Sequence, residues 1–454
     1  MRSLWRDLRR PEIAFLWIGV IWGSLFVFVT PPFQVPDENR HFYRAYQIAA
    51  GTILGEKQQD NVGGDLPYSV FITGESTSYL TYHWERKYRF RDTIILLGIP
   101  LNPQDRIFVP FVSVIYSPIP YVPQVLAILP ARLFELPPIL MMYFGRIFNF
   151  TAWLALTYLA IRITPIYQWL FALLALMPMS VFQASSLSVD AVTNGFAFLT
   201  IAFFLRCAFA EGKAVRLRDM GLLLLLTLCL SLCKVVYFLF VFLFLLIPRR
   251  KIGSVRRYLV LFLALATTTI IVAGSWNFCI KDFSTEVRAT AEVQAQIERI
   301  KTQPGQFIDI LLQTIRHRTG YLCDTFVGRL GWLDTPLPTY LIVSWWLLLT
   351  AAAIFESKPT IHVTLLHKGI LGGILAPTLL LMFTLMFIYW EPLGDTIIRG
   401  VQGRYLIPIS PLFFMLLYSR RFRRDLRPYE PALIMATILF STIALLVMTQ
   451  RFYG

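Results

Sequence analysis

The sequence predicts an all-α polytopic membrane protein with about 11 transmembrane helices and two larger extracytoplasmic loops, forming one integral-membrane domain over residues 1–454. Hydrophobic residues make up 56% of the chain and charged residues only 15%, whereas soluble domains carry roughly a quarter charged residues. The mean hydropathy is +0.60. Aromatic residues, at 15%, fit a chain whose interfaces with lipid need amphipathic rings. These values exclude a soluble globular enzyme.

The formal charge of +15 has a simple explanation in such a chain. An excess of Lys and Arg in cytoplasmic loops sets the orientation of membrane proteins, so we expect membrane lipid and no nucleic acid as a partner. Five cysteines in 454 residues make no disulfide framework. Whether Cys279 and Cys323 pair is left open.

The first helix is predicted at residues 13–29. Basic residues Arg2, Arg6, Arg9 and Arg10 precede this apolar run, which at about 1.5 Å per residue nearly crosses a bilayer. A signal peptide is the alternative, but no small-residue cleavage site follows the run. We therefore expect a retained helix, with the N-terminus in the cytoplasm and the next part of the chain outside.

Two polar regions are predicted as extracytoplasmic loops. Residues 31–106 contain no membrane-length apolar run and are expected to include interfacial helices, and residues 278–336 form the second loop. The apolar segments after the first loop lie at 112–134, 139–161, 167–183, 190–206, 219–233, 235–248, 257–277, 338–355, 369–390, 405–419 and 431–449.

Basic clusters set the predicted topology. Clusters near residues 206–218, 249–257, 358–368 and 420–427 are each separated by two apolar segments, so all four fit the cytoplasmic side. Five apolar segments lie between the N-terminus and the cluster at 206–218. Because both ends of this stretch are expected in the cytoplasm, the number of crossings between them must be even, so one of the five segments should not cross. We choose 112–134, an interfacial or re-entrant segment, because several prolines would leave backbone groups unsatisfied in lipid. The alternative fuses 219–248 into one long helix, which would put Lys234 mid-membrane.

Four polar stretches converge at the outer membrane surface in this topology, at residues 36–46, 183–194, 328–335 and 400–405. Ionisable residues at such a boundary are costly to desolvate and point to a functional site. Asp37 and Glu38 also fit the acidic first turn of an interfacial helix. That reading leaves the cations Arg40, His41 and Arg44 behind them unexplained. A carboxylate beside cations is suited to deprotonate a hydroxyl while the cations hold an anionic leaving group.

Arg404 is the first candidate for binding phosphate, because guanidinium matches phosphate oxygens in a planar fork. Its alternative role is snorkelling at a helix end. Lys234 either binds phosphate or caps a hairpin, and Asp190 either lines the site or caps the next helix. Arg146 and Asn149 share a helix face, where a structural hydrogen bond is the alternative to a site. The sequence has no zinc, Walker A or dinucleotide motif.

These stretches together resemble the DUF2142 family of polytopic membrane proteins, which is itself similar to the GT-C glycosyltransferase superfamily. The pieces that carry the resemblance are PPFQVPDENRHFYR (31–44), the Tyr-Ser-Pro and Tyr-Val-Pro of 116–118 and 121–123, QASSLSVDAVTN (183–194), Lys234 with Tyr237, Gly-Trp-Leu-Asp (331–334) and Gln-Gly-Arg-Tyr (402–405).

The resemblance implies a GT-C-like helix bundle in the cytoplasmic (inner) membrane, with an active site on the extracytoplasmic face. It implies a glycosyltransferase that moves a sugar from a polyprenyl-phosphate donor to an envelope glycan or lipid-linked acceptor, with inversion. In GT-C enzymes an acid of the first outer loop serves as base or helps bind a metal, which here is Asp37 with Glu38 as its neighbour or substitute. No cofactor is certain, and a divalent metal is left open.

The remaining expected site residues fall into two groups. The cations expected at the donor phosphate are Arg404, Arg44, Lys234 and Arg146, and the residues expected to bind substrate are His41, Gln183, Ser186, Asp190, Asn194, Trp332, Asp334, Gln402 and Tyr405. A flippase or transporter of a lipid-linked saccharide is the rival function, although midplane charges and broken helices in matching halves are not seen. A non-catalytic scaffold is the second rival.

Overall fold

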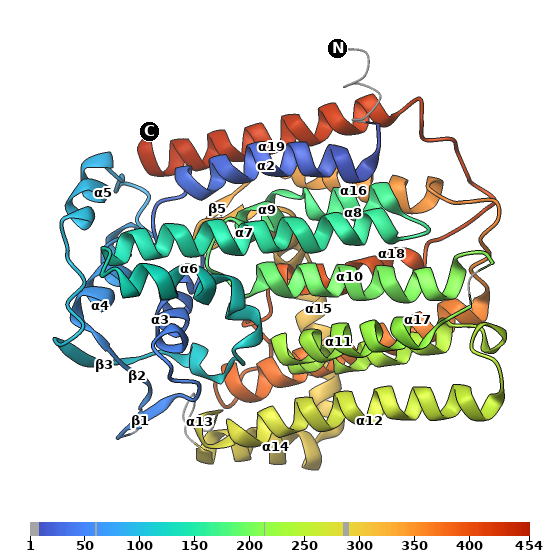
Figure 1. Cartoon of the computed structure of the whole chain (residues 1–454), viewed down its shortest axis with the longest axis horizontal. Coiled ribbons are helices and arrows are strands. Elements are labelled where there is room, and N and C mark those ends of the chain that lie inside the picture. The colour runs from blue at the N-terminus through green and yellow to red at the C-terminus, as the bar shows by residue number, and fades with distance from the viewer. Residues whose placement is uncertain (1–8, 60, 213, 285–289) are drawn as a thin grey trace.

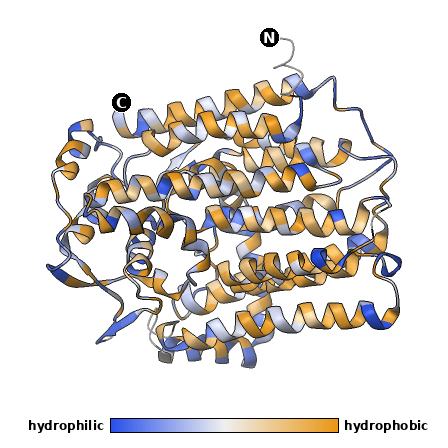
Figure 2. Ribbon diagram, in the orientation of Figure 1, coloured by the Kyte–Doolittle hydropathy of each residue, from blue (hydrophilic) through white to orange (hydrophobic). Residues whose placement is uncertain are grey.

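The structure, a computed structural model, describes residues 9–59, 61–212, 214–284 and 290–454. Within this part of the chain, six helices are long and apolar enough to cross a membrane (Figure 1). They are α2 (Pro11–Val29), α7 (Pro138–Ile163), α10 (Asp190–Phe209), α12 (Val255–Cys279), α17 (Leu365–Trp390) and α19 (Glu430–Tyr453). Figure 2 shows apolar residues along these helices and hydrophilic residues at the ends of the bundle.

The other predicted crossings are shorter or interrupted. They form α8 (Gln168–Ala175) with α9 (Pro178–Ala184), α11 (Leu217–Cys233), the 3₁₀ helix η4 (Val235–Leu246), α16 (Thr339–Phe355), and η6 (Gly403–Ile409) with α18 (Ser410–Met415). Prolines at 178, 408 and 411 interrupt the α-helical hydrogen bonding, because proline has no backbone N–H. The total of about 11 crossings stays a prediction.

Helix α10 lies at the centre of the bundle and α12 at its edge. Of the 20 residues of α10, 17 are buried, whereas only 22% of the apolar window of α12 is buried inside the protein. Helix α10 packs against α7 and α11, and α12 packs against α11 and η4. The surface of α12 is therefore available to lipid.

The chain reverses direction at Lys234, which overturns the alternative of one long helix over 219–248. Helix α11 ends at Cys233, Lys234 is extended, and η4 returns to the end of the bundle where α11 begins. There the N–H of Val215 donates to the carbonyl of Lys251. The loops that carry the four basic clusters gather at this end, at the right of Figure 1. Their common side fits the positive-inside rule, and its assignment to the cytoplasm stays a prediction.

The region predicted as the first outer loop, called the outer layer below, is a folded layer with its own hydrophobic core, at the left of Figure 1. Its helices are α3 (Glu38–Ala49), α4 (Tyr68–Glu75), the 3₁₀ turn η1 (Ser78–Leu80) and α5 (Phe90–Leu97). Ten of the 12 residues of α3 are buried, so α3 is enclosed by protein instead of lying exposed at an interface.

This layer also contains a small sheet that the all-α prediction missed. Strands β1 (Glu56–Gln58), β2 (Asn61–Pro67) and β3 (Arg106–Pro110) pair antiparallel in the order β1-β2-β3, with Asp65 opposite Phe108. A second pair joins β4 (Arg329–Leu330) and β5 (Thr335–Pro336). The chain is predominantly helical with little sheet.

Two further regions complete the fold. Residues 112–134 form η2 (Val112–Ile115), η3 (Ile119–Tyr121) and α6 (Val122–Leu133), and α6, at about 18 Å, is shorter than a bilayer core. Residues 278–336 contain α13 (Lys281–Ser284), α14 (Thr290–Thr302) and α15 (Pro304–Val327). Helix α15 runs across the long helices in Figure 1. The placement of both regions relative to a membrane stays a prediction.

Candidate functional site

A cavity of about 360 Å³ lies where α3, η2, the junction of α11 and η4, α12, α17 and η6 meet. Its polar lining includes Asp37, Arg40, His41 and Lys234, together with the rings of Tyr116, Trp276, Tyr389 and Tyr405. Most of the remaining wall is apolar and comes from η2, the end of α11, η4, α12 and α17. A concave site with a few convergent polar groups is the usual form of a ligand-binding pocket.

Asp37 reaches the cavity from a strained backbone position. Its φ of 63° lies in the left-handed region, directly before α3, where Asp is tolerated better than most residues. The carboxylate is 39% exposed. Its Oδ1 lies 3.1 Å from Nη1 of Arg40, and its Oδ2 lies 3.7 Å from Nη2 of Arg404. Such strain is characteristic of functional sites.

Arg404 lies between two carboxylates, directly behind the cavity wall. Its Nη1 is 3.8 Å from Oδ2 of Asp190, and its Nε donates to Oε1 of Gln402 at 2.6 Å. The side chain is only 4% exposed and does not line the cavity. Gly403 makes this position accessible, because a Cβ there would overlap the backbone of α15 at Leu322 and Phe326.

Lys234 also lines the cavity and belongs to the same charge cluster, through Asp190. Its Nζ lies 2.5 Å from Oδ1 of Asp190 and 5.0 Å from the centroid of the Tyr405 ring. Gln183 Nε2 donates to Oδ2 of Asp190 at 2.8 Å. The carboxylate of Asp190, the first residue of α10, thus holds Gln183, Lys234 and Arg404 together.

The charges at the site favour an anionic ligand. The cations Arg40, Lys234 and Arg404 face the carboxylates Asp37 and Asp190, which leaves an excess of one positive charge. Burial lowers the pKa of His41 to about 4, so its imidazole is neutral at pH 7. Nδ1 of His41 lies 2.8 Å from the hydroxyl of Tyr121.

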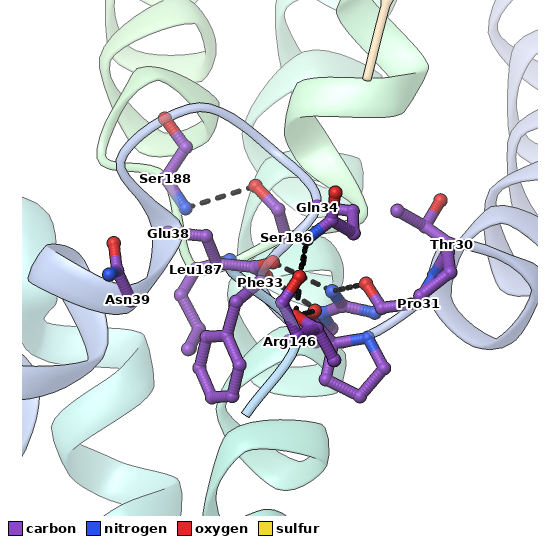
Figure 3. A network of polar contacts seen from close by, with 12 residues as sticks. Thr30, Pro31, Phe33, Gln34, Glu38, Asn39, Arg146, Ser186, Leu187 and Ser188 are labelled. Atoms are coloured by element: carbon purple, nitrogen blue, oxygen red, sulfur yellow. Dashed lines mark hydrogen bonds and ion pairs between the residues drawn. The ribbon is translucent and has the colours of Figure 1, made fainter. Parts of the chain in front are cut away.

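Glu38 is adjacent to Asp37 in sequence but does not line the cavity, and Figure 3 shows it in a polar network with Arg146. Its two oxygens accept from Nε and Nη2 of Arg146, both at 2.7 Å, and the N–H of Leu187 donates to Oε1 at 3.1 Å. Arg146 also donates to three carbonyls at the end of α2, those of Val27, Thr30 and Pro31. The expected roles of Glu38 in catalysis and of Arg146 at the phosphate do not fit this placement, because the two charges pair with each other in the protein interior, outside the cavity lining.

Arg44 is likewise buried outside the cavity. It donates to Oε1 of Gln47 at 2.6 Å and to the carbonyls of Ile53 at 2.7 Å and Tyr116 at 3.2 Å. Its guanidinium therefore holds the outer layer behind Tyr116, and the expected contact with phosphate does not fit this placement.

Trp332 and Asp334, which were expected to bind substrate, make their contacts away from the cavity. Trp332 Nε1 donates to the carbonyl of Phe33 at 3.1 Å, and Asp334 lies 3.1 Å from Nη2 of Arg451. They join the second outer loop to the first loop and to α19, away from the cavity lining.

The stretch before α10 mixes site and scaffold residues. Ser186 donates its hydroxyl to the carbonyl of Gln183, and Asn149 donates to the carbonyls of Ser186 and Ser188. Asn194 is buried, and its amide makes no hydrogen bond to any described residue. Ser186 and Asn194 thus lie outside the cavity lining, whereas Gln183 supports it through Asp190.

Two parts of the site were missed from the sequence. Arg40 was noted among the cations behind Asp37 but was not assigned a role in binding, although it pairs with Asp37 and lines the cavity. Met382, Leu385 and Met386 of α17 form apolar wall, and nothing distinguishes them in sequence from other residues of an apolar helix.

A metal has few ligands at this site. Within the described ranges, no group of three His, Cys, Asp or Glu side chains is arranged to hold a metal ion. Arg404 occupies the position between Asp37 and Asp190 that a bridging cation would take. The two candidate cysteines, Cys279 and Cys323, are both free thiols.

Comparison with known proteins places most of the chain in one family. No curated protein and no solved structure matches it. The model of the DUF2142 family, described as predicted membrane proteins, matches residues 20–413, a range that includes Asp37, Asp190, Lys234 and Arg404. The chain therefore belongs to the DUF2142 family of predicted membrane proteins.

Proposed function

We propose that the protein is a GT-C-type glycosyltransferase. It transfers a sugar from a polyprenyl-phosphate-linked donor to a hydroxyl of an envelope glycan or lipid-linked acceptor on the extracytoplasmic face of the inner membrane. The observation that carries the proposal is that Asp37 and Lys234 line one cavity, with Asp190 paired to Lys234 and Arg404 between Asp37 and Asp190.

The charge of the cavity supports a phosphate-bearing donor. Lys234 and Arg40 line the cavity directly, and hydrogen bonds between cations and phosphate oxygens are shorter and stronger than neutral ones. Because Arg404 lies behind the wall, its contribution is to orient Asp37 and to add positive potential. The excess of one positive charge matches a phosphodiester, which carries one negative charge.

The apolar wall supports a lipid-linked donor. Met382, Leu385 and Met386 come from α17, and Ile280 directly follows α12. Helices α12 and α17 are among the least buried long helices, with 22% and 39% of their apolar windows buried. A prenyl chain bound along this wall stays in an apolar environment, which favours binding by roughly 25 cal/mol per Å² buried.

The chemistry is a single displacement at the anomeric carbon. Asp37 accepts the proton of the acceptor hydroxyl, whose oxygen forms a bond to the anomeric carbon. The bond from that carbon to the phosphate oxygen breaks, and its electron pair stays on the phosphate. Lys234 and Arg40 offset the charge that grows there. One displacement inverts the configuration of the sugar.

The test is transfer by the full-length protein in proteoliposomes. A panel of radiolabelled polyprenyl-phosphate hexoses and pentoses is offered together with a membrane lipid and glycan extract as acceptor. Asp37→Asn is compared with Asp105→Asn, which changes an exposed acid of the same outer layer away from the cavity. We expect Asp37→Asn to lower transfer at least 100-fold, in the range typical of a lost general base, and Asp105→Asn to leave it unchanged.

Two results would overturn the proposal. Transfer by Asp37→Asn at the parental rate would remove Asp37 as base. Movement of the labelled lipid across the vesicle membrane without any bond cleavage would assign the cavity to a flippase instead.

A further inference from the structure

A second cavity, of about 630 Å³, lies at the end of the bundle opposite Asp37. It is enclosed by the end of α10 at Phe209 and Ala210, by Pro248, Arg250 and Lys251, and by the connection from α16 into α17, including Thr364. These segments belong to the loops that gather at the right of Figure 1. The proposed transfer reaction makes no use of this cavity.

Arg250 gives the cavity an available cation. Its side chain is exposed and makes no hydrogen bond or ion pair with any described residue. Lys251, by contrast, donates to the carbonyls of Cys207 at 3.1 Å and Ala210 at 2.6 Å and so caps the end of α10. Glu211 is the acidic residue of the lining. On the rim, the guanidinium of Arg420 contacts the ring of His362.

The first turn of α17 borders the same cavity. Thr364 is its N-cap and exchanges hydrogen bonds with His367, whose N–H donates to the Thr364 hydroxyl at 3.3 Å and whose Nδ1 accepts the Thr364 N–H at 3.1 Å. The N–H of Lys368 donates to the carbonyl of Thr364, so in this first turn the N–H groups of Leu365 and Leu366 are the ones left without an intrahelical partner. The helix dipole there favours an anion. An arginine and the N-terminus of a 26-residue helix thus face one space.

Two leucines beside this space indicate where the anion comes from. Leu365 and Leu366, the first two residues of α17, are 87% and 72% exposed. Exposed leucines next to cations are typical of the boundary between headgroups and acyl chains. A soluble anion would use the arginine and the helix end but would leave these leucines in water.

We infer that this cavity binds the phosphate headgroup of an anionic phospholipid, with Arg250 and the first turn of α17 at the phosphate and the acyl chains against Leu365 and Leu366. Basic pockets between transmembrane helices are known to bind anionic headgroups. This lipid site is separate from the Asp37 cavity and is independent of the proposed transfer reaction.

The test is native mass spectrometry of the full-length protein in micelles doped with phosphatidylglycerol or phosphatidylcholine. Arg250→Gln is compared with Arg249→Gln, a matched change of the neighbouring exposed arginine that does not line the cavity. We expect Arg250→Gln to weaken phosphatidylglycerol binding about tenfold, as expected for one lost charge-assisted hydrogen bond, and Arg249→Gln to change it less than twofold. Phosphatidylcholine binding is expected to be weak in all three proteins.

A second pair of measurements separates a lipid from a soluble phosphate. Glycerol phosphate and inorganic phosphate are added at millimolar concentration, and neither is expected to displace the lipid. Displacement by either would assign the cavity to a soluble phosphate and overturn the lipid site. If Arg249→Gln and Arg250→Gln weakened phosphatidylglycerol binding equally, the binding would be explained by general surface charge. This result would also overturn the lipid site. Replacing both Leu365 and Leu366 by Ser is expected to weaken lipid binding severalfold.

Discussion

Glu38 and Arg146 form a bidentate ion pair in which Nε and Nη2 of the arginine each lie 2.7 Å from a carboxylate oxygen and neither side chain is exposed. The pair joins the start of α3 to the middle of α7, and Arg146 also holds the end of α2 through three carbonyls. The position of Asp37, one residue earlier, therefore depends on this pair.

Glu38→Gln is predicted to destabilise the fold. Removing one partner leaves a buried arginine without its counter-charge, which costs roughly 3–5 kcal/mol. The measurement is the thermal unfolding midpoint in detergent, with Asp105→Asn, a change of an exposed acid of the same outer layer, as the control. Glu38→Gln combined with Arg146→Met should recover part of the loss, since the charges are then removed together. A parental midpoint for Glu38→Gln alone would contradict the structural role.

Arg40→Gln is predicted to weaken donor binding about tenfold, the effect of losing one charge-assisted contact. Arg40 lines the cavity and its side chain is 45% exposed, so the fold should tolerate the change. Arg399→Gln, with a side chain 67% exposed and outside the cavity lining, is the control. Binding is measured with a fluorescent polyprenyl phosphate. Equal affinities of the two variants would remove Arg40 from the phosphate site.

Arg404→Gln is predicted to lower kcat at least tenfold while changing KM for the donor less than threefold. Arg404 lies behind the cavity wall and contacts Asp37 at 3.7 Å, so it acts by orienting the base. Arg404→Lys, which keeps the charge, should recover part of kcat. A rise in KM with unchanged kcat would mean that Arg404 contacts the donor itself.

The stability of the protein is predicted to fall as pH drops from 6.5 towards 4, in part through His41. Burial lowers the pKa of His41 to about 4, below the ordinary value of about 6.5. Over this range the unfolded chain binds a proton that the folded protein excludes, so acid favours unfolding. The effect is roughly 2 kcal/mol at pH 4.5. His41→Gln should show a smaller drop of its unfolding midpoint between pH 7 and 4.5, and an identical drop would contradict the prediction.

Arg451→Met is predicted to loosen residues 78–88 of the first outer loop. Arg451, in α19, donates to the carbonyl of Leu80 at 2.7 Å and pairs with Asp334, and the N–H of Tyr88 donates to the carbonyl of Phe452. Limited trypsin digestion near Arg86 and Lys87 should become severalfold faster. Arg427→Met, with a side chain 82% exposed, should digest at the parental rate there. Equal rates for both variants would show that α19 does not restrain the loop.

The sequence predicted the long helices well because an uninterrupted apolar run leaves few alternatives. The predicted segments 139–161, 257–277, 369–390 and 431–449 coincide with α7, α12, α17 and α19. The segment at 235–248 is apolar as predicted but forms a 3₁₀ helix, which hydropathy does not distinguish from an α-helix. The sheet was missed because β2 contains Gly63 and Gly64 and shows no regular alternation.

The candidate site was harder to predict residue by residue. The structure brings Asp37, Asp190, Lys234 and Arg404 together from four separate stretches. Three of these lie in polar stretches expected to converge, 36–46, 183–194 and 400–405, whereas the fourth expected stretch, 328–335, lies away from the cavity. The sequence could not separate Asp37 from Glu38, or Arg404 from Arg146, because a charged residue has the same composition signal in a cavity and in a buried pair. Only the packing of α2, α3 and α7 decides between the two.

The left-handed backbone of Asp37 has a consequence for how this position can vary in evolution. Glycine adopts a φ near 63° at low cost, and asparagine and aspartate adopt it more readily than other residues. Substitutions at position 37 should therefore be confined largely to these three residues, whatever chemistry the carboxylate performs. Homologues with Asn or Gly there would keep the chain path and lose the acid. Such homologues would keep the fold around position 37 but would lack the carboxylate proposed as the base.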